Sequence, residues 1–351
     1  MTKTILVNAT SLSSGGGLTI LNEYLSDLDL NAEINANYYV FMPDACKLIA
    51  MQPNIVYIRN TENKYYKSRN YWNIFGMRQW CKANKIWPDE LFSLQNYFPY
   101  GFRTGVTRKT LYIHQPIPFF EYKWDILNKE ERILWFYKNV YYYMIKASVS
   151  AAHQVIVQTE WLKRRVAEVW PYARAKIVVE RPVVKSIDVQ GTRYIDGLKG
   201  KHRLFYPASE VLYKNHEVLY KAMDIIVNHH KLDDVVLYLT LDAGSLRASR
   251  YIKEYNLHKN IELTGKLSYE EVTAYYKSAT ALVFPSKIET FGLPLIEAQQ
   301  FGLPIIASNM DLYREVIGDY EGHVVYCGCE DAREWAKAII ALRENISIKK
   351  S

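Results

Sequence analysis

The segment 284–297, FPSKIETFGLPLIE, combines two carboxylates with a glycine and a proline at an expected strand-to-helix transition. Glu289 is expected on the turn, and Glu297 lies eight residues on, in a helix that should begin near Pro294. Proline suits a first helical turn because its missing N–H would have no partner there, and Gly292 lets the backbone approach a ligand closely. The amides at such a helix end favour a diphosphate, and the carboxylates can accept hydrogen bonds from sugar or ribose hydroxyls. The alternative is that both glutamates only complement the helix dipole.

Other positions could contribute to the same chemistry. Lys214 lies between an expected strand and an expected helix, where its ammonium group would partly balance a diphosphate. Gly15, Gly16 and Gly17 follow the first expected strand, without the Lys-Ser/Thr of a P-loop or the GxGxxG spacing of a dinucleotide site. His114 ends another expected strand. The alternatives are a solvated lysine, a flexible glycine turn and a hydrogen-bonded structural histidine.

The elements that would position these residues alternate between short apolar runs and helical patterns, which predicts βαβ units and parallel sheets. In such sheets ligands bind at the carboxyl ends of the strands. We predict an α/β protein with an N-terminal domain at 1–182, a linker at 183–201 and a C-terminal domain at 202–331. A last helix at about 332–351 is expected to pack back on the first domain. Strands are expected at 3–8, 38–42, 55–58, 91–94, 111–114, 155–158, 203–206, 235–240, 261–264, 281–284 and 304–307.

The composition of the 351 residues, 49% hydrophobic and 23% charged, excludes wholesale disorder and collagen-like or coiled-coil architectures. No run of eighteen apolar residues occurs, and the apolar start is too short for a signal peptide, so a cytoplasmic location is expected. Four cysteines are few, and a reducing compartment would keep them as thiols. His323, Cys327 and Cys329 form an H-x3-C-x-C cluster that lacks a fourth zinc ligand nearby, so no metal is expected.

The net charge of +7 lies entirely in the first half of the chain. Residues 1–180 hold 22 lysines and arginines against 15 acids, whereas residues 181–351 hold 22 of each. Basic residues between 59 and 87 alternate with aromatics, and the helical stretch near 129–150 adds more of both. Such a mixture could bind anionic lipid, because each basic residue near the membrane surface adds on the order of 1 kcal/mol to the binding free energy. The alternative is core packing for the aromatics and a solvated face for the lysines. The basic residues are Arg59, Lys64, Lys67, Arg69, Arg78, Lys82 and Lys85, and the aromatics are Tyr65, Tyr66, Tyr71, Trp72, Phe75, Trp80 and Trp87.

The segment 265–319, from GKLSYEE to YREVIGD, resembles the C-terminal domain of family 4 retaining glycosyltransferases of the GT-B fold. That fold has two Rossmann-like parallel-sheet domains facing a cleft. Glu289 and Glu297 match the E-x7-E motif of the family, which implies that the first contacts the donor sugar and the second binds the nucleotide ribose. The resemblance also implies that the diphosphate is lined by Thr290, Phe291, Gly292 and Leu293.

Outside that segment the resemblance is carried by single positions. Lys214 matches the family lysine that neutralises the donor diphosphate, and His114 matches the histidine beside the donor sugar. The loop with Gly16 and Gly17 matches one that borders the donor phosphates. Ser209 departs from the pattern, because the family usually has an arginine five residues before the lysine.

The resemblance implies a metal-independent, retaining glycosyltransferase that moves a sugar from a nucleotide diphosphate-sugar to an acceptor hydroxyl. It implies a glycan or lipid-linked glycan acceptor in O-antigen or capsule synthesis, no cofactor, and a peripheral position on the inner face of the plasma membrane. Two other classes stay open. A nucleotide-sugar epimerase of the GT-B fold would need no acceptor, and a single-stranded nucleic-acid-binding protein would use the basic, aromatic first half.

Overall fold

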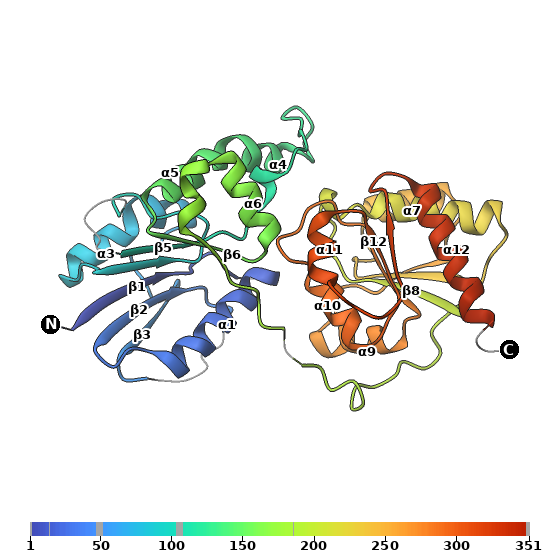
Figure 1. The fold of residues 1–351 in the computed structure, drawn as a ribbon, viewed down its shortest axis with the longest axis horizontal. Coiled ribbons are helices and arrows are strands. Elements are labelled where there is room, and N and C mark those ends of the chain that lie inside the picture. The colour runs from blue at the N-terminus through green and yellow to red at the C-terminus, as the bar shows by residue number, and fades with distance from the viewer. Residues whose placement is uncertain (1, 14, 47–51, 103–107, 185, 349–351) are drawn as a thin grey trace. The chain divides into compact units, whose positions relative to one another are not determined.

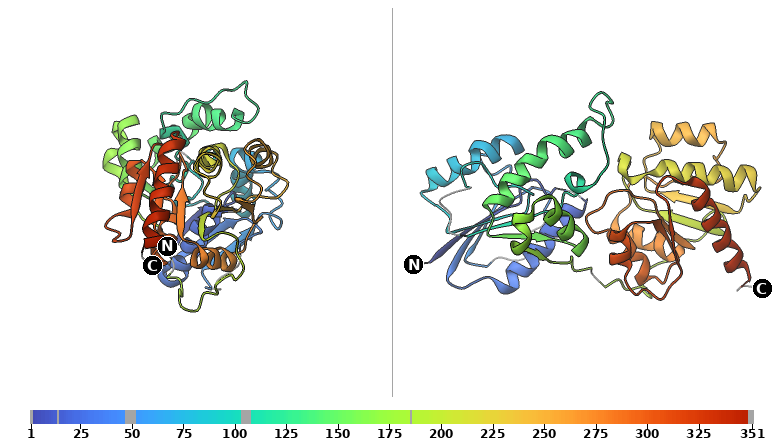
Figure 2. Two further views of the ribbon diagram at one scale, coloured as in Figure 1. Left: turned by 90° about the vertical axis from the view of Figure 1, so that its right-hand side faces the viewer. Right: turned by 45° about the horizontal axis from the view of Figure 1, so that its top comes forward.

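The computed structural model describes residues 2–13, 15–46, 52–102, 108–184 and 186–348. The chain divides into two compact units, Met1–Val183 and Val184–Ser351, which we call the first and second domains. Each contains one parallel sheet with helices on both faces, as Figures 1 and 2 show. The predicted α/β architecture with two Rossmann-like domains is therefore confirmed. Residue 185 of the predicted linker and residues 349–351 of the predicted last helix lie outside the described residues.

The first domain has a seven-stranded sheet in the order β3-β2-β1-β4-β5-β6-β7. Its central strands are apolar on both faces, as expected for a parallel sheet covered on each side. The order reverses between β1 and β4, which makes the carboxyl ends of these two strands a topological switch point. The strands are β1 (Lys3–Asn8), β2 (Ala36–Met42), β3 (Ile55–Arg59), β4 (Glu90–Ser93), β5 (Arg108–Tyr112), β6 (Gln154–Val157) and β7 (Ile177–Val179).

The helices of the first domain include two π-helical turns, η1 and η3, each inside a longer helical stretch. The helical elements are α1 (Gly15–Asn31), α2 (Arg69–Tyr71), η1 (Trp72–Gly76), α3 (Met77–Asn84), η2 (Ile117–Phe119), α4 (Arg132–Phe136), η3 (Tyr137–Tyr141), α5 (Tyr142–Ala151), α6 (Glu160–Val169) and η4 (Pro171–Lys176).

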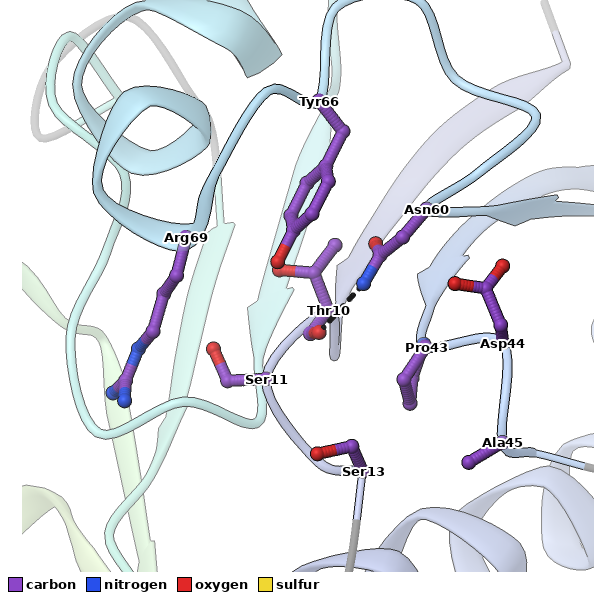
Figure 3. A pocket seen from close by; sticks show the side chains of 9 residues that line it. All are labelled: Thr10, Ser11, Ser13, Pro43, Asp44, Ala45, Asn60, Tyr66 and Arg69. Carbon is purple, nitrogen blue, oxygen red and sulfur yellow. Dashed lines mark hydrogen bonds between the residues drawn. The ribbon is translucent and has the colours of Figure 1, made fainter.

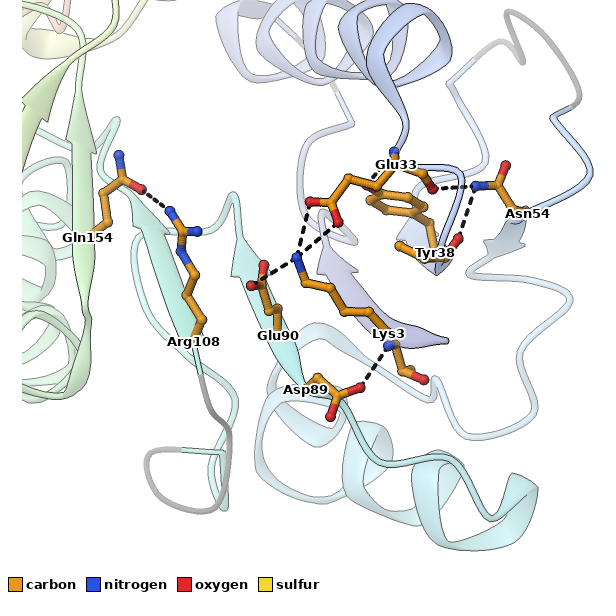
Figure 4. A network of polar contacts seen from close by, with 10 residues as sticks. Lys3, Glu33, Tyr38, Asn54, Asp89, Glu90, Arg108 and Gln154 are labelled. Atoms are coloured by element: carbon orange, nitrogen blue, oxygen red, sulfur yellow. Dashed lines mark hydrogen bonds and ion pairs between the residues drawn. The ribbon is translucent and has the colours of Figure 1, made fainter. Parts of the chain in front are cut away.

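Polar contacts pin the amino ends of the central strands (Figure 4). The Lys3 ammonium on β1 lies 3.0 Å from Glu33, which precedes β2, and 3.1 Å from Glu90 on β4. The backbone N–H of Thr4 donates to Asp89 at 2.8 Å. These contacts fix the register of β1, β2 and β4 and leave the opposite ends of the strands to carry ligand-binding loops.

The second domain has a six-stranded sheet in the order β10-β9-β8-β11-β12-β13, with its switch point between β8 and β11. Its strands are β8 (His202–Tyr206), β9 (Val235–Leu239), β10 (Ile261–Leu263), β11 (Ala281–Phe284), β12 (Ile305–Ser308) and β13 (Val324–Cys327). Its helical elements are η5 (Leu212–Lys214), α7 (His216–Asp224), η6 (Ile225–His229), α8 (Leu246–Glu254), α9 (Tyr269–Ser278), α10 (Leu293–Gln300), α11 (Asp311–Ile317) and α12 (Ala332–Ile348).

The last helix, α12, packs against α7 of its own domain (Figure 1). Its apolar spacing of Trp335, Ile339 and Leu342 is buried there. Arg343 also pairs with Asp234, at the amino end of β9, through two bonds of 2.9 and 3.0 Å. A nearby apolar face of the second domain is thus the partner surface that the spacing required.

Part of the predicted linker is also held against the second domain. The N–H of Ile187 donates to Gln300 at 2.7 Å, and the N–H of Ile195 donates to Ser278 at 2.8 Å. The ammonium group of Lys277 donates to the carbonyl of Val189 at 2.6 Å. These bonds explain why a stretch with weak periodicity has a defined path.

Candidate functional site

The loops after β8 and β11 meet at the switch point of the second domain. The N–H of Lys287 donates to the carbonyl of Tyr213 at 2.7 Å, and the side-chain amide of Asn215 donates to the carbonyl of Pro285 at 3.1 Å. The buried Tyr313 hydroxyl donates to the carbonyl of Ser286 at 2.9 Å. The two loops are thus bonded to each other and to the core beneath them.

This junction brings together Lys214 and Glu289, two of the predicted site residues. The ammonium nitrogen of Lys214 lies 2.5 Å from Oε1 of Glu289, and the side chains are only 19% and 14% exposed. The Tyr206 hydroxyl donates to the carbonyl of Lys214 at 2.9 Å and fixes the backbone below the pair. Because an ammonium group has three donors, one bond to Glu289 leaves others for an anion placed between the loops.

The turn that follows Glu289 has the conformation that its glycine allows. Gly292 has φ +96°, in the left-handed region, and a Cβ there would lie 3.2 Å from the Leu295 side chain. Phe291 is 7% exposed, so its side chain belongs to the core, and only its backbone could line a diphosphate. Helix α10 begins at Leu293, and the N–H groups at a helix start have no intrahelical acceptors.

Glu297 lies on α10, one turn beyond its start. Its carboxylate accepts a 2.9 Å hydrogen bond from the hydroxyl of Tyr276, a fully buried residue on α9. Burial raises the pKa of Glu297, and the Tyr276 bond opposes that rise. The bond orients the carboxylate while leaving its other oxygen as an acceptor for a ligand hydroxyl.

A second cation near Lys214 was missed by sequence reasoning. Arg247 lies in the first turn of α8, after β9, and Ser245 at the start of that helix donates to Glu210 in the loop after β8. Burial, with the charges of Lys214 and Arg247 adding to it, lowers the pKa of His216 to about 3. Both cations therefore act on one imidazole. The signal that could have found Arg247 is its place after the strand next to β8.

In the first domain, His114 lies two residues beyond the end of β5. Its Nε2 is 2.8 Å from the carbonyl of Leu94, and its backbone N–H donates to Asn96 at 2.7 Å. Burial, with the charge of Arg69 adding to it, lowers the pKa of His114 to about 4. The imidazole is thus neutral at pH 7. Since a carbonyl can only accept, Nε2 carries the proton and Nδ1 remains an acceptor.

Gly16 and Gly17 lie in the first turn of α1. Among the described residues, nothing lies within 4 Å of a Cβ built at Gly16, whereas one at Gly17 would be 3.2 Å from the Leu12 side chain. Packing therefore does not require glycine at position 16, and a bare backbone there leaves room for a ligand. Gly16, Gly17 and His114 belong to the first domain, and the other predicted site residues belong to the second.

The basic and aromatic stretch at 59–87 divides between core and surface. Trp72 and Trp80 are buried, so they are core residues. Arg59 donates to the carbonyl of Asp44 at 2.7 Å. The exposed members are Lys64, Lys67, Arg78, Lys82, Lys85, Phe75 and Trp87.

A further apolar stripe follows the long helical stretch α4-η3-α5. Ile133, Phe136, Val140 and Tyr143 recur at intervals of three and four residues, and all are exposed. Lys138 in the same stretch is half-buried and donates to the carbonyl of Pro118 at 3.2 Å. Among the described residues no helix is long and apolar enough to cross a membrane.

Metal-binding side chains do not gather anywhere in the part of the chain that the structure describes: no three His, Cys, Asp or Glu residues there could hold an ion. Cys327 of the H-x3-C-x-C cluster is buried at the end of β13, and burial raises its thiol pKa to about 12.

Comparisons with known proteins agree with this geometry. The family model described as glycosyl transferases group 1 matches residues 196–350. The O-antigen chain mannosyltransferase RfbU of Salmonella typhimurium is 24% identical over 214 residues, which cover 58% of this chain and 55% of that protein. The chain spans about half the length of the first curated relatives it matches.

Solved structures show the same fold over nearly the whole chain. Sucrose-phosphate synthase from Thermosynechococcus elongatus has a TM-score of 0.70 at 16% identity, covering 97% of this chain and 90% of that one. Anabaena HepE in complex with UDP and glucose has a TM-score of 0.61 at 13% identity, covering 98% and 91%. The chain has the two-domain GT-B fold, and the match of the glycosyl transferases group 1 model over the second domain confirms the resemblance to family 4 glycosyltransferases.

Proposed function

We propose that the protein is a retaining, metal-independent glycosyltransferase that moves a sugar from a nucleotide diphosphate-sugar to an acceptor hydroxyl. The acceptor would be a lipid-linked glycan in O-antigen or capsule synthesis. The relatives support this direction, since RfbU is an O-antigen chain mannosyltransferase and HepE was solved with UDP and glucose.

The observation that carries the proposal is the Lys214–Glu289 pair beside the start of α10. A cation, a carboxylate and backbone amides at one switch point suit two parts of a nucleotide-sugar, its diphosphate and its sugar. The ammonium group and the amides after Glu289 suit the diphosphate, and the carboxylate suits the sugar hydroxyls. Glu297, oriented by Tyr276, would bind the ribose.

The proposed chemistry depends mainly on electrostatics. Departure of the nucleoside diphosphate builds negative charge on its outer phosphate, which Lys214 and the α10 amides would stabilise. Arg247 would supply the second positive charge that Ser209 cannot provide. In the retaining mechanism the acceptor hydroxyl attacks from the face that the diphosphate leaves, and a phosphate oxygen accepts its proton. His114, whose imidazole is neutral at pH 7, would accept a hydrogen bond from a donor-sugar hydroxyl at Nδ1.

The two glutamates provide the experiment that tests these roles. Glu297→Ala should mainly weaken donor affinity in calorimetry, and Glu289→Ala should mainly lower the turnover of sugar transfer. An epimerase would convert the nucleotide-sugar at an undiminished rate without any acceptor. Wild-type donor affinity and turnover in both variants would contradict the roles proposed for Glu289 and Glu297.

We also propose that the first domain docks on an anionic membrane. The exposed basic residues at 64–85 and the apolar stripe on α4-η3-α5 support this, because anionic lipid attracts the former and its interface accepts the latter. Replacing Lys64, Lys67, Lys82 and Lys85 with serine should release the protein from anionic liposomes, and salt should do the same in the wild type. Equal sedimentation with neutral and anionic vesicles, or with neither, would contradict the proposal.

A further inference from the structure

The first domain contains a pocket of about 400 Å³ at the carboxyl ends of β1, β2 and β3 (Figure 3). Its volume falls within the range of small-molecule sites, roughly 300–1,000 Å³. Such sites are usually lined mainly by apolar side chains, whereas polar side chains dominate here. They include Thr10, Ser11 and Ser13 from the loop after β1 and Asn60 from the end of β3. A ligand that fits this lining must itself be rich in hydroxyl or charged groups.

The wall that carries Thr10 and Ser11 is held by a buried hydrogen-bond network. The Gln95 amide donates to Asn8 at 2.7 Å and to the Thr10 hydroxyl at 2.9 Å, and the Ser11 hydroxyl donates to Gln95. The Trp72 indole also donates to Asn8, at 3.0 Å. These bonds are formed without a ligand, so this wall is already in place for binding. They also explain why Trp72 is a core residue.

Opposite charges stand on opposite sides of the pocket (Figure 3). The half-buried Arg69 donates to the phenol oxygen of the buried Tyr141 at 3.2 Å and also forms a hydrogen bond with the Tyr97 hydroxyl, and among the described residues it forms no ion pair with a carboxylate. Asp44, on the far side, accepts bonds of 3.1 and 2.5 Å from the N–H and hydroxyl of Thr61. Those bonds, the hydroxyl first, lower the pKa of Asp44 and keep it ionised.

A half-buried guanidinium without a carboxylate is an unusual arrangement, because charges taken out of water are normally paired. Its five N–H donors exceed the two phenol oxygens that they contact, and their planar fork matches a phosphate or carboxylate. Tyr66, which also lines the pocket, adds a further hydroxyl (Figure 3).

We propose that this pocket binds a sugar unit that carries an anionic group, a phosphate or a carboxylate. Arg69 binds the anion, while Asp44 and the hydroxyls of the β1 loop bind the hydroxyls of the ring. The unit belongs to the acceptor, and this part of the inference rests on the proposed function. The proposal assigns Arg69 to ligand binding, although its sequence neighbourhood suggested a lipid-facing charge.

Calorimetry on the full chain tests the pocket with glucose 6-phosphate, glucuronate and neutral glucose as probes. At least one anionic probe should bind more tightly than glucose, and the pair distinguishes phosphate from carboxylate recognition. Arg69→Gln should weaken that anionic probe by at least about tenfold, since hydrogen bonds between charged groups are the strong ones. Glucose binding should not change. Arg69→Lys, which keeps the charge, should retain part of the affinity.

Matched variants locate the binding. Lys67→Gln removes an exposed charge two residues away, and Lys214→Gln removes the cation of the second domain; both should leave anionic-probe affinity within about twofold. Ala45→Leu fills the pocket rim without removing a hydrogen bond, so it should weaken the binding of all three probes. This variant tests the pocket even if Arg69→Gln does not fold. Anionic binding that ignores Arg69→Gln, that is lost in Lys214→Gln instead, or that is absent from the wild type would overturn the proposal.

Nucleotide binding, measured on the same samples, separates the two proposals. Arg69→Gln should bind nucleoside diphosphates like the wild type. If no nucleotide binds but Arg69-dependent sugar binding persists, the proposed function fails and the pocket stands. If nucleotides bind but sugar binding ignores Arg69, only the pocket assignment fails.

Discussion

Removing the Lys214 ammonium group should reduce catalysis far more than removal of a typical lysine. The group is 19% exposed and lies 2.5 Å from Glu289 at the proposed diphosphate site. Loss of one preorganised donor to developing negative charge costs about 2.7–4 kcal/mol, or 10²–10³ in turnover. Lys214→Ala should therefore lower kcat/KM at least a hundredfold.

The same substitution has a second, separable effect on stability. It leaves the Glu289 carboxylate, 14% exposed, without its cation, which should cost about 1–3 kcal/mol of unfolding free energy. Lys214→Ala combined with Glu289→Ala removes both charges, so it should recover much of the stability but none of the activity. A loss of activity caused by misfolding would instead recover together with the stability.

Lys221→Ala provides the matched control. This lysine lies on α7, seven residues on, and its pair with Glu217 is 47% exposed on both sides, so it should contribute less than about 1 kcal/mol. Sugar-transfer kinetics and urea unfolding on all four proteins complete the experiment. A loss of less than about fivefold in kcat/KM for Lys214→Ala would refute the reasoning and show that another cation holds the diphosphate.

The remaining predictions concern the turn, the second cation and the buried histidine. Gly292→Ala should lower the free energy of unfolding by about 1–2 kcal/mol, because φ is +96°, and should also weaken donor binding. Gly302→Ala, also at positive φ, should lower stability in urea unfolding but leave donor binding in calorimetry unchanged. Arg247→Ala should lower kcat/KM at least about tenfold, while Arg250→Ala, at an exposed position on the same helix, should keep kcat/KM within twofold of the wild type. Equal effects of the two substitutions would show that Arg247 is not the second cation of the diphosphate site. His114 has a pKa of about 4 folded and about 6.5 unfolded, so the unfolded state binds its proton first as pH falls below 6.5. Relative to His114→Gln, the wild type should lose about 2 kcal/mol of unfolding free energy between pH 7 and 5; parallel pH profiles would contradict this.

Much of the fold could be predicted because the central strands are continuous apolar runs. The observed bounds of β1 and β11 are those expected from their sequences. The short strands β7 and β13, each at an edge of its sheet, were missed. Residues 160–169 also form a helix, α6, that was not expected.

Side-chain directions were less predictable. The π-helical turn η1 breaks the 3.6-residue period between Trp72 and Trp80, so their burial could not be derived from spacing. Arg69, in the same stretch, points into a pocket whose other walls come from loops up to about 60 positions earlier in the chain. Composition identified a basic, aromatic stretch but could not assign its members to core, pocket and surface.

The candidate site residues could be named from the sequence, but their contacts could not. Lys214 and Glu289 were found through family motifs and their places after strands, but their ion pair depends on β8 and β11 being neighbours. Strand order is set by the packing of the whole sheet, which local periodicity does not encode. For the same reason, Arg247 became a candidate only when β9 was seen beside β8.

The most direct test of the central claim is a thermal-shift measurement with UDP, GDP and dTDP on the wild type and on Lys214→Ala. At 100 times its dissociation constant, a bound nucleotide adds about 2.7 kcal/mol of stability, which is a measurable rise in Tm. We expect one of the three to raise the Tm of the wild type and to have little effect on Lys214→Ala. No shift with any nucleotide, or the same shift in both proteins, would contradict a nucleotide-sugar site at Lys214 and Glu289.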